Sequence, residues 1–238
     1  KVDSVETIRF DKNRNPKEVE VKGVPILLDG EVVGGYGIYT DISRRKEAER
    51  EILWISYHDQ LTGLYNRRYF ETRIREINQP ENLPISVVMA DLNGLKLAND
   101  AFGHATGDQL LVKTGEMISA HLKGNDFVAR TGGDEFIVVM LNADDEDARE
   151  FVSRVNRTIL ENNGDRIDLS VSFGWDTKTK LDQSIHNVIN KAENYMYKRK
   201  LSEGPSMVSS TIKIIIKKKK KKNEREKQHS DRVSRICM

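Results

Sequence analysis

The sequence predicts an α+β fold of the ferredoxin-like type over most of the chain. An apolar run is followed by an amphipathic helical segment, by two short strands joined through a Gly-Gly pair, and then by a second helical segment and an alternating strand. This order, β-α-β-β-α-β, is that of a split βαβ domain with an antiparallel central sheet. One more helix is expected after the last strand.

The individual elements follow from the spacing of apolar residues. Helical segments carry apolar side chains three and four residues apart, strands carry apolar runs or alternation, and Gly132-Gly133 is a hairpin signal. The expected elements are a helix over 70–77, a strand over 85–90, a helix over about 107–122, strands over 127–130 and 136–141, a helix over 148–159, a strand over 169–173 and a helix over 185–196.

Residues 1–42 form a separate region of short strands that is too small to fold alone. The expected strands are 18–24, 25–28 and 32–40, with an Asp29-Gly30 turn between the last two.

Residues 43–57 read as a charged linker helix between this region and the domain at 58–205. Ala48, Ile52 and Ile55 are spaced by four and three residues, which favours a short two-helix coiled coil. A solvated linker helix is the alternative.

Charge is distributed unevenly along the 238 residues. The formal net charge is +2, but residues 207–238 hold eleven Lys or Arg against three Asp or Glu, so the remainder carries −6. A mildly acidic body lacks the basic face that supplies most nucleic-acid affinity, so no nucleic-acid partner is expected. The six consecutive lysines indicate a solvated basic tail over 206–238.

Composition indicates a cytoplasmic protein. Hydrophobic residues are 37% and charged residues 32% of the chain, and the single Cys237 leaves neither a disulfide nor a cysteine metal site. No apolar run approaches the roughly 20 residues that span a bilayer, and the N-terminus has no signal-peptide pattern. A longer parent protein could still be anchored in a membrane.

The strongest chemical signal is TGGDEF at residues 131–136. A given pentapeptide such as GGDEF is expected by chance in about one of ten thousand chains of this length. The two glycines allow a nucleotide to approach the backbone closely, and the adjacent Asp134 and Glu135 at a turn favour a bound cation. A solvated hairpin tip is the alternative for an acidic turn.

Asp91, at the end of an apolar strand, is the second half of the predicted site. In a ferredoxin-like sheet this strand lies beside the hairpin, which brings Asp91 towards Asp134. Two carboxylates and a main-chain carbonyl near Leu92 form an open oxygen site suited to Mg²⁺, which takes water and phosphate oxygens as its other ligands. Further candidates for nucleotide contacts are Lys96 for phosphates, and Asn99 and Asp108 for a base edge.

These motifs resemble those of the GGDEF family of diguanylate cyclases over residues 59–201. DQLTGLYNRRYF at 59–70 matches the family's opening motif D-x-L-T-G-L-x-N-R-R-x-F in full, and ARTGGDEF matches outright. DLNGLKLANDAFGHATGD is similar to the family's D-x-D-x-F-K-x-x-N-D-x-x-G-H-x-x-G-D, while SVSFGW and AENYMYKRK are similar to its S-x-G strand and final helix. The resemblance implies a nucleotidyl cyclase, or palm-like, variant of the ferredoxin-like fold.

The resemblance also implies a role for each matched residue. Either Asp134 or Glu135 assists loss of the 3′-OH proton of GTP, with a metal lowering the pKa of that hydroxyl. The other implied roles are metal binding (Mg²⁺ or Mn²⁺) by Asp91, the Leu92 carbonyl and Asp134, guanine binding by Asn99 and Asp108, phosphate binding by Lys96 and Lys200, and close approach of the substrate at Gly132 and Gly133.

Three departures from the family pattern change what is expected. Asn93 replaces an acid near the metal but not a ligand, so activity should survive. The family's K-x-x-G-[RK] becomes Lys200-Leu201-Ser202-Glu203-Gly204, which weakens the phosphate grip. The family's inhibitory R-x-x-D motif becomes Lys123-Gly124-Asn125-Asp126, so weak or absent product inhibition is expected because lysine lacks the planar donors of arginine.

The implied activity is condensation of two GTP molecules into cyclic di-GMP by a homodimer. Each domain holds one GTP, so the two active sites must meet, and the 43–57 helix is the obvious device for bringing them together. The alternative is a regulatory domain that binds GTP or cyclic di-GMP without turnover, and the altered final helix keeps it open.

Both flanking regions resemble parts of other domains. GVPILLDGEVVGGYGIYTDISRRKEAE resembles the C-terminal half of a PAS domain with its Asp-Ile-Ser exit, and an arbitrary hairpin is the alternative. EREKQHSDRV resembles the first helix of an HD-GYP phosphodiesterase. Only His229 of that domain's metal-binding set is present, so phosphodiesterase activity is not expected here. Further sensor and HD-GYP domains are expected in a longer parent protein.

Overall fold

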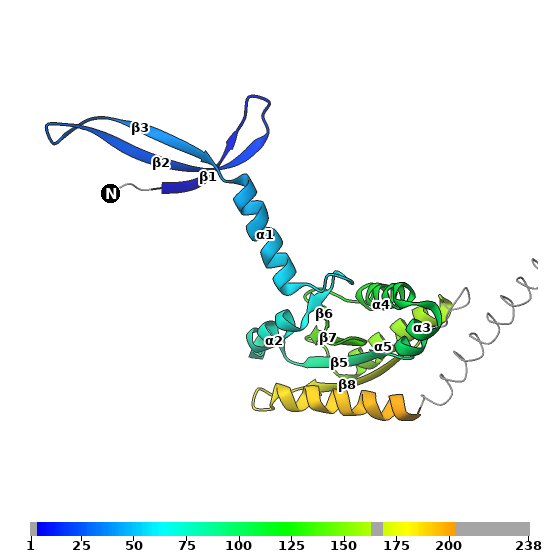
Figure 1. The fold of residues 1–238 in the computed structure, drawn as a ribbon. Coiled ribbons are helices and arrows are strands. Elements are labelled where there is room, and N and C mark those ends of the chain that lie inside the picture. Colours follow the sequence, from blue (N-terminus) through cyan, green and yellow to red (C-terminus); the bar gives the residue numbers. More distant parts are fainter. Residues whose placement is uncertain (1–3, 163–168, 203–238) are drawn as a thin grey trace, which may run out of the picture. The chain divides into compact units, whose positions relative to one another are not determined.

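The computed structural model describes residues 4–162 and 169–202. The chain divides into two compact units, Lys1–Ser56 and Tyr57–Met238, and each unit has its own sheet (Figure 1). The tail at 206–238, with its likeness to an HD-GYP helix, lies outside the described residues. Within the described ranges, no helix is long and apolar enough to cross a bilayer.

The N-terminal unit contains a three-stranded antiparallel sheet in the order β1-β2-β3. Its strands are β1 (Ser4–Phe10), β2 (Pro16–Leu28) and β3 (Glu31–Asp41). β2 is one strand where the sequence predicted two. Pro25 pairs with Gly35 of β3, and among the described residues it has no partner in β1, so its missing N–H breaks no described pairing on that side. That this sheet belongs to a PAS domain stays a prediction.

Helix α1 (Ser43–Tyr57) has the bounds expected for the linker helix. The Ser43 N–H donates to Asp41 Oδ1 at 2.9 Å, which satisfies one of the free amides at the start of the helix. The Lys17 ammonium and this hydrogen bond hold the pKa of Asp41 well below its usual range. The apolar side chains at 52–55 are all exposed in the single chain, so the predicted coiled-coil face has no cover within α1's own unit.

The second unit is built on a five-stranded sheet in the order β4-β6-β7-β5-β8. The inner order β6-β7-β5-β8, antiparallel throughout, confirms the ferredoxin-like arrangement. β4 was not predicted and pairs parallel with β6, so the sheet is not wholly antiparallel. The strands are β4 (Tyr65–Asn66), β5 (Ile85–Leu92), β6 (Phe127–Arg130), β7 (Glu135–Leu141) and β8 (Val171–Lys178).

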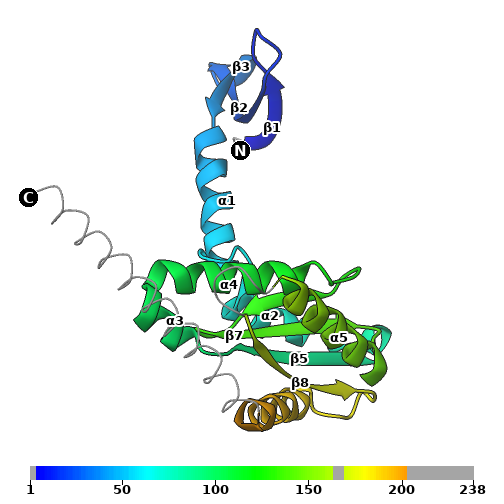
Figure 2. The ribbon, with the colours of Figure 1, turned by 90° about the vertical axis from the view of Figure 1, so that its right-hand side faces the viewer.

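Helices cover both faces of this sheet (Figures 1 and 2). On one face α4 (His104–Ser119) and α5 (Asp145–Glu161) pack over a core that includes Phe136, Phe151 and Phe173. On the other face α2 (Arg67–Glu76) and the helix at 185–202 pack over a second core that includes Ile74, Val188 and Met196. Because both faces are covered, all eight residues of β5 are buried, which explains the continuous apolar run in the sequence.

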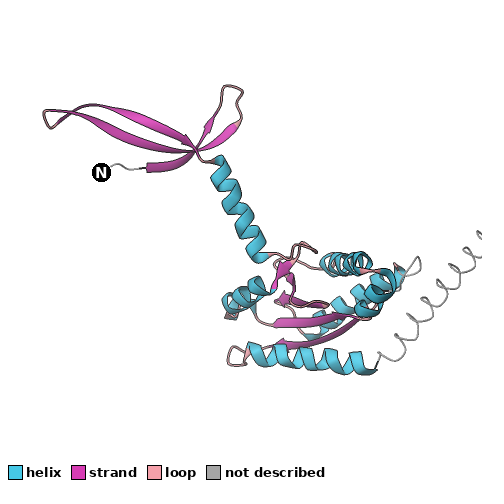
Figure 3. Ribbon diagram, viewed as in Figure 1, coloured by secondary structure: helices cyan, strands magenta, loops and turns pink. Residues whose placement is uncertain are grey.

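Four local features of the helices and strands, which Figure 3 colours by type, differ from the sequence prediction. Helix α3 (Leu95–Phe102) was not predicted; it lies between Gly94 and Gly103, which adopt left-handed φ values of 73° and 86°. α4 begins and ends three residues earlier than expected. β8 begins at Val171 instead of Leu169 and runs to Lys178, because it pairs with β5 over its full length. A short 3-10 helix, Pro80–Asn82, precedes β5.

Candidate active site

The end of β5 and the β6–β7 turn form the centre of the candidate site. Asp91 of β5 lies opposite Glu135 of β7 in the antiparallel register. The next residue, Leu92, donates its N–H to the Asp134 carbonyl at 2.9 Å. The sheet therefore brings together the three acids that the sequence analysis placed in one site.

The two glycines of the turn have different environments. A Cβ on Gly132 would lie 2.6 Å from Glu135 Oε2, so the absence of a side chain there makes room for Glu135 itself. A Cβ on Gly133 would meet no atom within 4 Å, so its backbone faces open space that a phosphate can enter. The amides of Thr131 and Gly132 both donate to the Glu135 carbonyl, at 3.0 and 3.4 Å, and close the turn.

Asp91 is a buried acid in a strongly charged setting. Burial raises its pKa, the negative charges of Asp134 and Glu135 raise it further, and Lys200 opposes both effects. The Lys200 Nζ atom lies 2.6 Å from Asp91 Oδ1. The helix at 185–202 thus brings the predicted phosphate-binding lysine directly to the predicted metal ligand.

The donor set at this centre suits a hard divalent cation. It consists of carboxylates and main-chain carbonyls, the oxygen ligands that Mg²⁺ prefers. The Lys200 ammonium shows that a positive charge is accommodated beside Asp91 Oδ1. Within the described residues no group of three or more His, Cys, Asp or Glu side chains is arranged to hold a metal, so a metal here would rely on backbone, water or phosphate for its remaining ligands.

Helices α3 and α4 position the residues predicted to contact the nucleotide. Asn99 of α3 packs against Gly107 of α4, where a Cβ would lie only 1.9 Å from Asn99 Oδ1. This places Asn99 beside the start of α4, which carries Asp108. The Asn99 Oδ1 atom is buried and accepts no hydrogen bond from the described residues. Lys96 is exposed in the first turn of α3.

Asn93 replaces the family's second acid and joins two strands. Its Nδ2 atom donates to the hydroxyls of Ser170 and Ser172, at 3.1 and 3.0 Å, and its backbone N–H donates to the Ser170 carbonyl. These contacts fix the segment that follows Asp91 against β8. The side chain therefore has a structural role in this chain.

Arg130 organises the turn, although no sequence motif singled it out as a site residue. Its guanidinium donates to both carboxylate oxygens of Asp59, at 3.0 and 3.2 Å, and to the Gly133 carbonyl at 2.7 Å. Arg130 and Asp59 belong to motifs that were noted, but nothing in the local pattern indicated that they pair.

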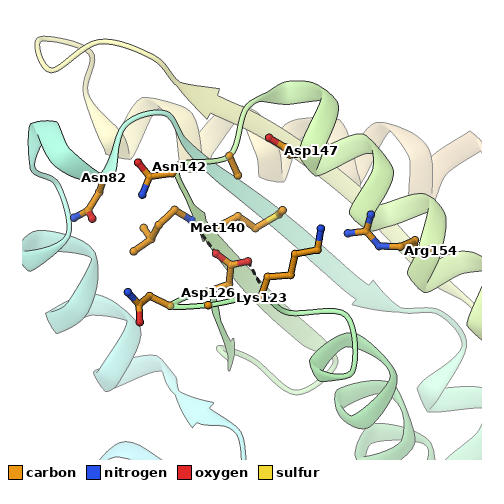
Figure 4. Close-up of a pocket in the computed structure, with 11 residues that line it drawn as sticks. Asn82, Lys123, Asp126, Met140, Asn142, Asp147 and Arg154 are labelled. Carbon is orange, nitrogen blue, oxygen red and sulfur yellow. Dashed lines mark hydrogen bonds between the residues drawn. The ribbon is translucent and has the colours of Figure 1, made fainter.

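Lys123 and Asp126 lie at the opposite end of the β6–β7 hairpin from the acidic turn. The Asp126 carboxylate accepts from the N–H groups of Leu141 and Lys123, at 3.0 and 3.2 Å, and burial raises its pKa. Both residues line a pocket of about 350 Å³ to which α5 contributes Arg154 (Figure 4). Since β7 is seven residues long, this pocket is about 20 Å from Asp134 and forms a separate site.

Comparison with known proteins gives the same family over the same part of the chain. The family model described as "Diguanylate cyclase, GGDEF domain" matches residues 56–205. The signaling protein YkoW of Bacillus subtilis is 31% identical over 186 residues, which cover 74% of this chain and 23% of that protein. The probable diguanylate cyclase DgcC of Escherichia coli is 28% identical over 183 residues, which cover 74% of this chain and 49% of that protein.

A solved structure of a sensory box/GGDEF family protein from Caulobacter crescentus is also similar. It is 30% identical, with a TM-score of 0.54, and the match covers 61% of this chain and 99% of that chain. The present chain spans between about a quarter and a half of the length of the two curated relatives described above. From the family model, which matches more than half of the chain, we conclude that the chain belongs to the diguanylate cyclase, GGDEF domain family.

Proposed function

We propose that this protein is a diguanylate cyclase that condenses two GTP molecules into cyclic di-GMP and two pyrophosphates. The observation that carries the proposal is the meeting of Asp91, Asp134 and Glu135 at one end of the sheet, with Lys200 in contact with Asp91. A cluster of acids that retains a lysine is suited to binding a metal together with a triphosphate.

Each residue has a defined part in this proposal. Asp91, the Leu92 carbonyl and Asp134 hold Mg²⁺ or Mn²⁺; when bound, the ion lowers the pKa of the 3′-OH and offsets the charge of the triphosphate. Lys96 and Lys200 bind phosphate oxygens, and the open space at Gly133 admits them. Either Asp134 or Glu135 accepts the 3′-OH proton.

Guanine is the base that fits the residues of α3 and α4. Its Watson–Crick edge presents two neighbouring donors, N1–H and the N2 amino group. Asn99 Oδ1 is a buried acceptor that accepts no hydrogen bond from the described residues, and the Asp108 carboxylate is acceptor-only. A base with an acceptor at N1, such as adenine, would leave one of these groups unpaired, which disfavours its binding.

The chemistry requires two copies of the domain. In each of two equivalent steps the 3′-oxygen of one GTP attacks the α-phosphorus of the other, the bond to the β-phosphate breaks, and pyrophosphate leaves. One domain binds one GTP, so a homodimer supplies the second reactant at high effective concentration. The exposed apolar residues of α1 provide a dimerisation face for this purpose. In a longer parent protein, the N-terminal sheet would be part of a PAS sensor and the tail would lead into an HD-GYP domain.

The test is incubation with GTP and Mg²⁺ followed by chromatography of the products. The unmodified protein is expected to form cyclic di-GMP, and Asp91→Asn and Asp134→Asn are each expected to abolish its formation while circular dichroism stays unchanged. If GTP binds without turnover, the chain is instead a regulatory nucleotide-binding domain. Near-normal synthesis by either variant would refute the proposed metal site.

A further inference from the structure

The contact between Lys200 and Asp91 puts a cation at the proposed metal position. The Asp91 side chain is 4% exposed, whereas the Lys200 side chain, whose Nζ lies 2.6 Å from Asp91 Oδ1, is 37% exposed. A buried carboxylate beside two other acids is costly unless a positive charge balances it. Lys200 provides that charge to the nucleotide-free site.

The backbone of the helix at 185–202 is held on β8 by contacts that do not involve Lys200. A Cβ on Gly174 would lie 2.0 Å from the Met196 nitrogen and 2.4 Å from the Ala192 oxygen, so helix and strand are in backbone contact there. One turn later, Arg199 Nη1 donates to the Phe173 carbonyl at 3.3 Å, and its guanidinium lies 4.6 Å from the centre of the Trp175 ring. The Lys200 side chain can therefore leave Asp91 while the helix stays in place.

We propose that Lys200 is a resident counter-ion of Asp91 that must be exchanged for the divalent metal when the nucleotide binds. The inference rests on the proposed metal site. An ammonium group and a divalent cation repel each other at one carboxylate oxygen, so the ion pair opposes metal binding in the absence of nucleotide. A triphosphate offers Lys200 new oxygen partners, which removes that opposition.

The exchange couples metal binding to nucleotide binding. A bound metal favours release of Lys200 from Asp91, and the released Lys200 can bind phosphate. The metal therefore raises the affinity for the nucleotide, and the nucleotide raises the affinity for the metal by the same factor. If Lys200 only bound phosphate, its removal would not change the affinity of the nucleotide-free protein for the metal. The exchange and a simple phosphate contact therefore predict different metal affinities for the nucleotide-free protein, and this affinity can be measured without GTP or turnover.

The experiment measures Mn²⁺ binding to the nucleotide-free full chain by electron paramagnetic resonance. Lys200→Met is expected to bind Mn²⁺ about 5- to 20-fold more tightly than the unmodified protein. This factor is at the low end of the coupling usually found between two bound groups, because Lys200 is partly exposed and solvent screens its charge. Lys198→Met, which removes an exposed lysine from the same helix, is the control, and its affinity should stay within about twofold. Lys200→Gln is the second variant, since its amide can hydrogen-bond Asp91 without a charge.

The affinity of the same variant for a nucleotide is expected to change in the opposite direction. In the presence of Mg²⁺, the α,β-methylene analogue of GTP should bind Lys200→Met more weakly than the unmodified protein, because a phosphate contact is lost. Unchanged or weaker Mn²⁺ affinity in folded Lys200→Met or Lys200→Gln would overturn the exchange, even if the unmodified protein makes cyclic di-GMP. Conversely, tighter Mn²⁺ binding without any cyclic di-GMP synthesis would support the exchange and refute the cyclase.

Discussion

The Arg130 guanidinium pairs with both carboxylate oxygens of Asp59 and links the loop at the start of the second unit to the acidic turn. Arg130 Nη1 donates to both Asp59 oxygens, and Nη2 donates to the Gly133 carbonyl next to Asp134. Asp59 is held in turn by the N–H and hydroxyl groups of Thr62, at 2.9 and 2.7 Å. One guanidinium group therefore sets the position of the turn relative to the first loop of its unit.

We predict that Arg130→Met lowers the free energy of unfolding by about 1–3 kcal/mol, because it leaves the half-buried Asp59 without its charged partner. The side chains of Arg130 and Asp59 are only 13% and 25% exposed, so solvent screens the pair weakly. Arg67→Met, which breaks an exposed pair with Glu71, is the control and should cost less than about 0.5 kcal/mol. Urea unfolding measures both, and equal losses would contradict the prediction.

The same pair predicts a pH dependence of stability. Burial opposes the ionised form of Asp59, but hydrogen bonds from Thr62 and Arg130 outweigh it and lower its pKa. A carboxyl with a lowered folded-state pKa contributes stability above its unfolded pKa of about 4 and loses that contribution as pH falls through the folded value. The stability difference between the unmodified protein and Asp59→Asn should therefore shrink below about pH 4. A difference that is constant from pH 7 to pH 3 would rule this out.

Gly174 is predicted to be intolerant of a side chain. In Gly174→Ala the new methyl group would overlap backbone atoms of Met196 and Ala192, so the helix at 185–202 must shift away from β8. We expect a loss of about 1–3 kcal/mol in thermal unfolding. Gly133→Ala, where a Cβ meets nothing within 4 Å, should change stability by less than about 0.5 kcal/mol. Equal thermal unfolding temperatures of Gly174→Ala and Gly133→Ala would contradict the prediction.

Activity is predicted to depend on the square of the protein concentration when the protein is dilute. One domain contributes half of the reactants, so monomers are inactive. Ile52→Asp places a charge on the exposed apolar face of α1 and should lower specific activity at low concentration, with recovery at high concentration. Glu51→Gln, at the neighbouring exposed position, is the control. Constant specific activity on dilution far below a measured dimer dissociation constant would contradict the dimer model.

Product inhibition is predicted to be weak, because Lys123 lacks the planar donors of the arginine that the family places there. Lys123 shares its pocket with Arg154, so Lys123→Arg would provide two guanidinium groups around one space. This substitution should strengthen inhibition by added cyclic di-GMP about 5- to 150-fold, corresponding to one bidentate contact of about 1–3 kcal/mol. Initial rates at increasing cyclic di-GMP measure the effect.

The matched variant for this test is Asp126→Asn. It removes the charge of Asp126 and keeps one oxygen, which can accept one of the two hydrogen bonds that Asp126 receives from the N–H groups of Lys123 and Leu141. Micromolar inhibition of the unmodified protein, lost in Asp126→Asn, would show that the lysine suffices and that the prediction is wrong.

The sequence by itself determined the order of the four strands β6-β7-β5-β8 and the residues at the centre of the candidate site. The apolar run ending in Asp91 and the Gly-Gly turn before Asp134 are local signals, and a ferredoxin-like order allows few ways to pair the strands. The sequence also predicted the bounds of α1, because the strand pattern of the preceding residues changes at Ser43 to that of a charged helix.

Only the tertiary structure decided the features that depend on partners distant in sequence. β4 is two residues long and α3 eight, so both are too short for the spacing of apolar residues to mark them in the sequence. Arg130 finds Asp59 seventy-one residues away, and Lys200 reaches Asp91 because Gly174 lets the last helix touch β8. Local sequence carries the preference of each segment for helix or strand. Which charges become neighbours is fixed by packing, since the core positions the helices that carry them.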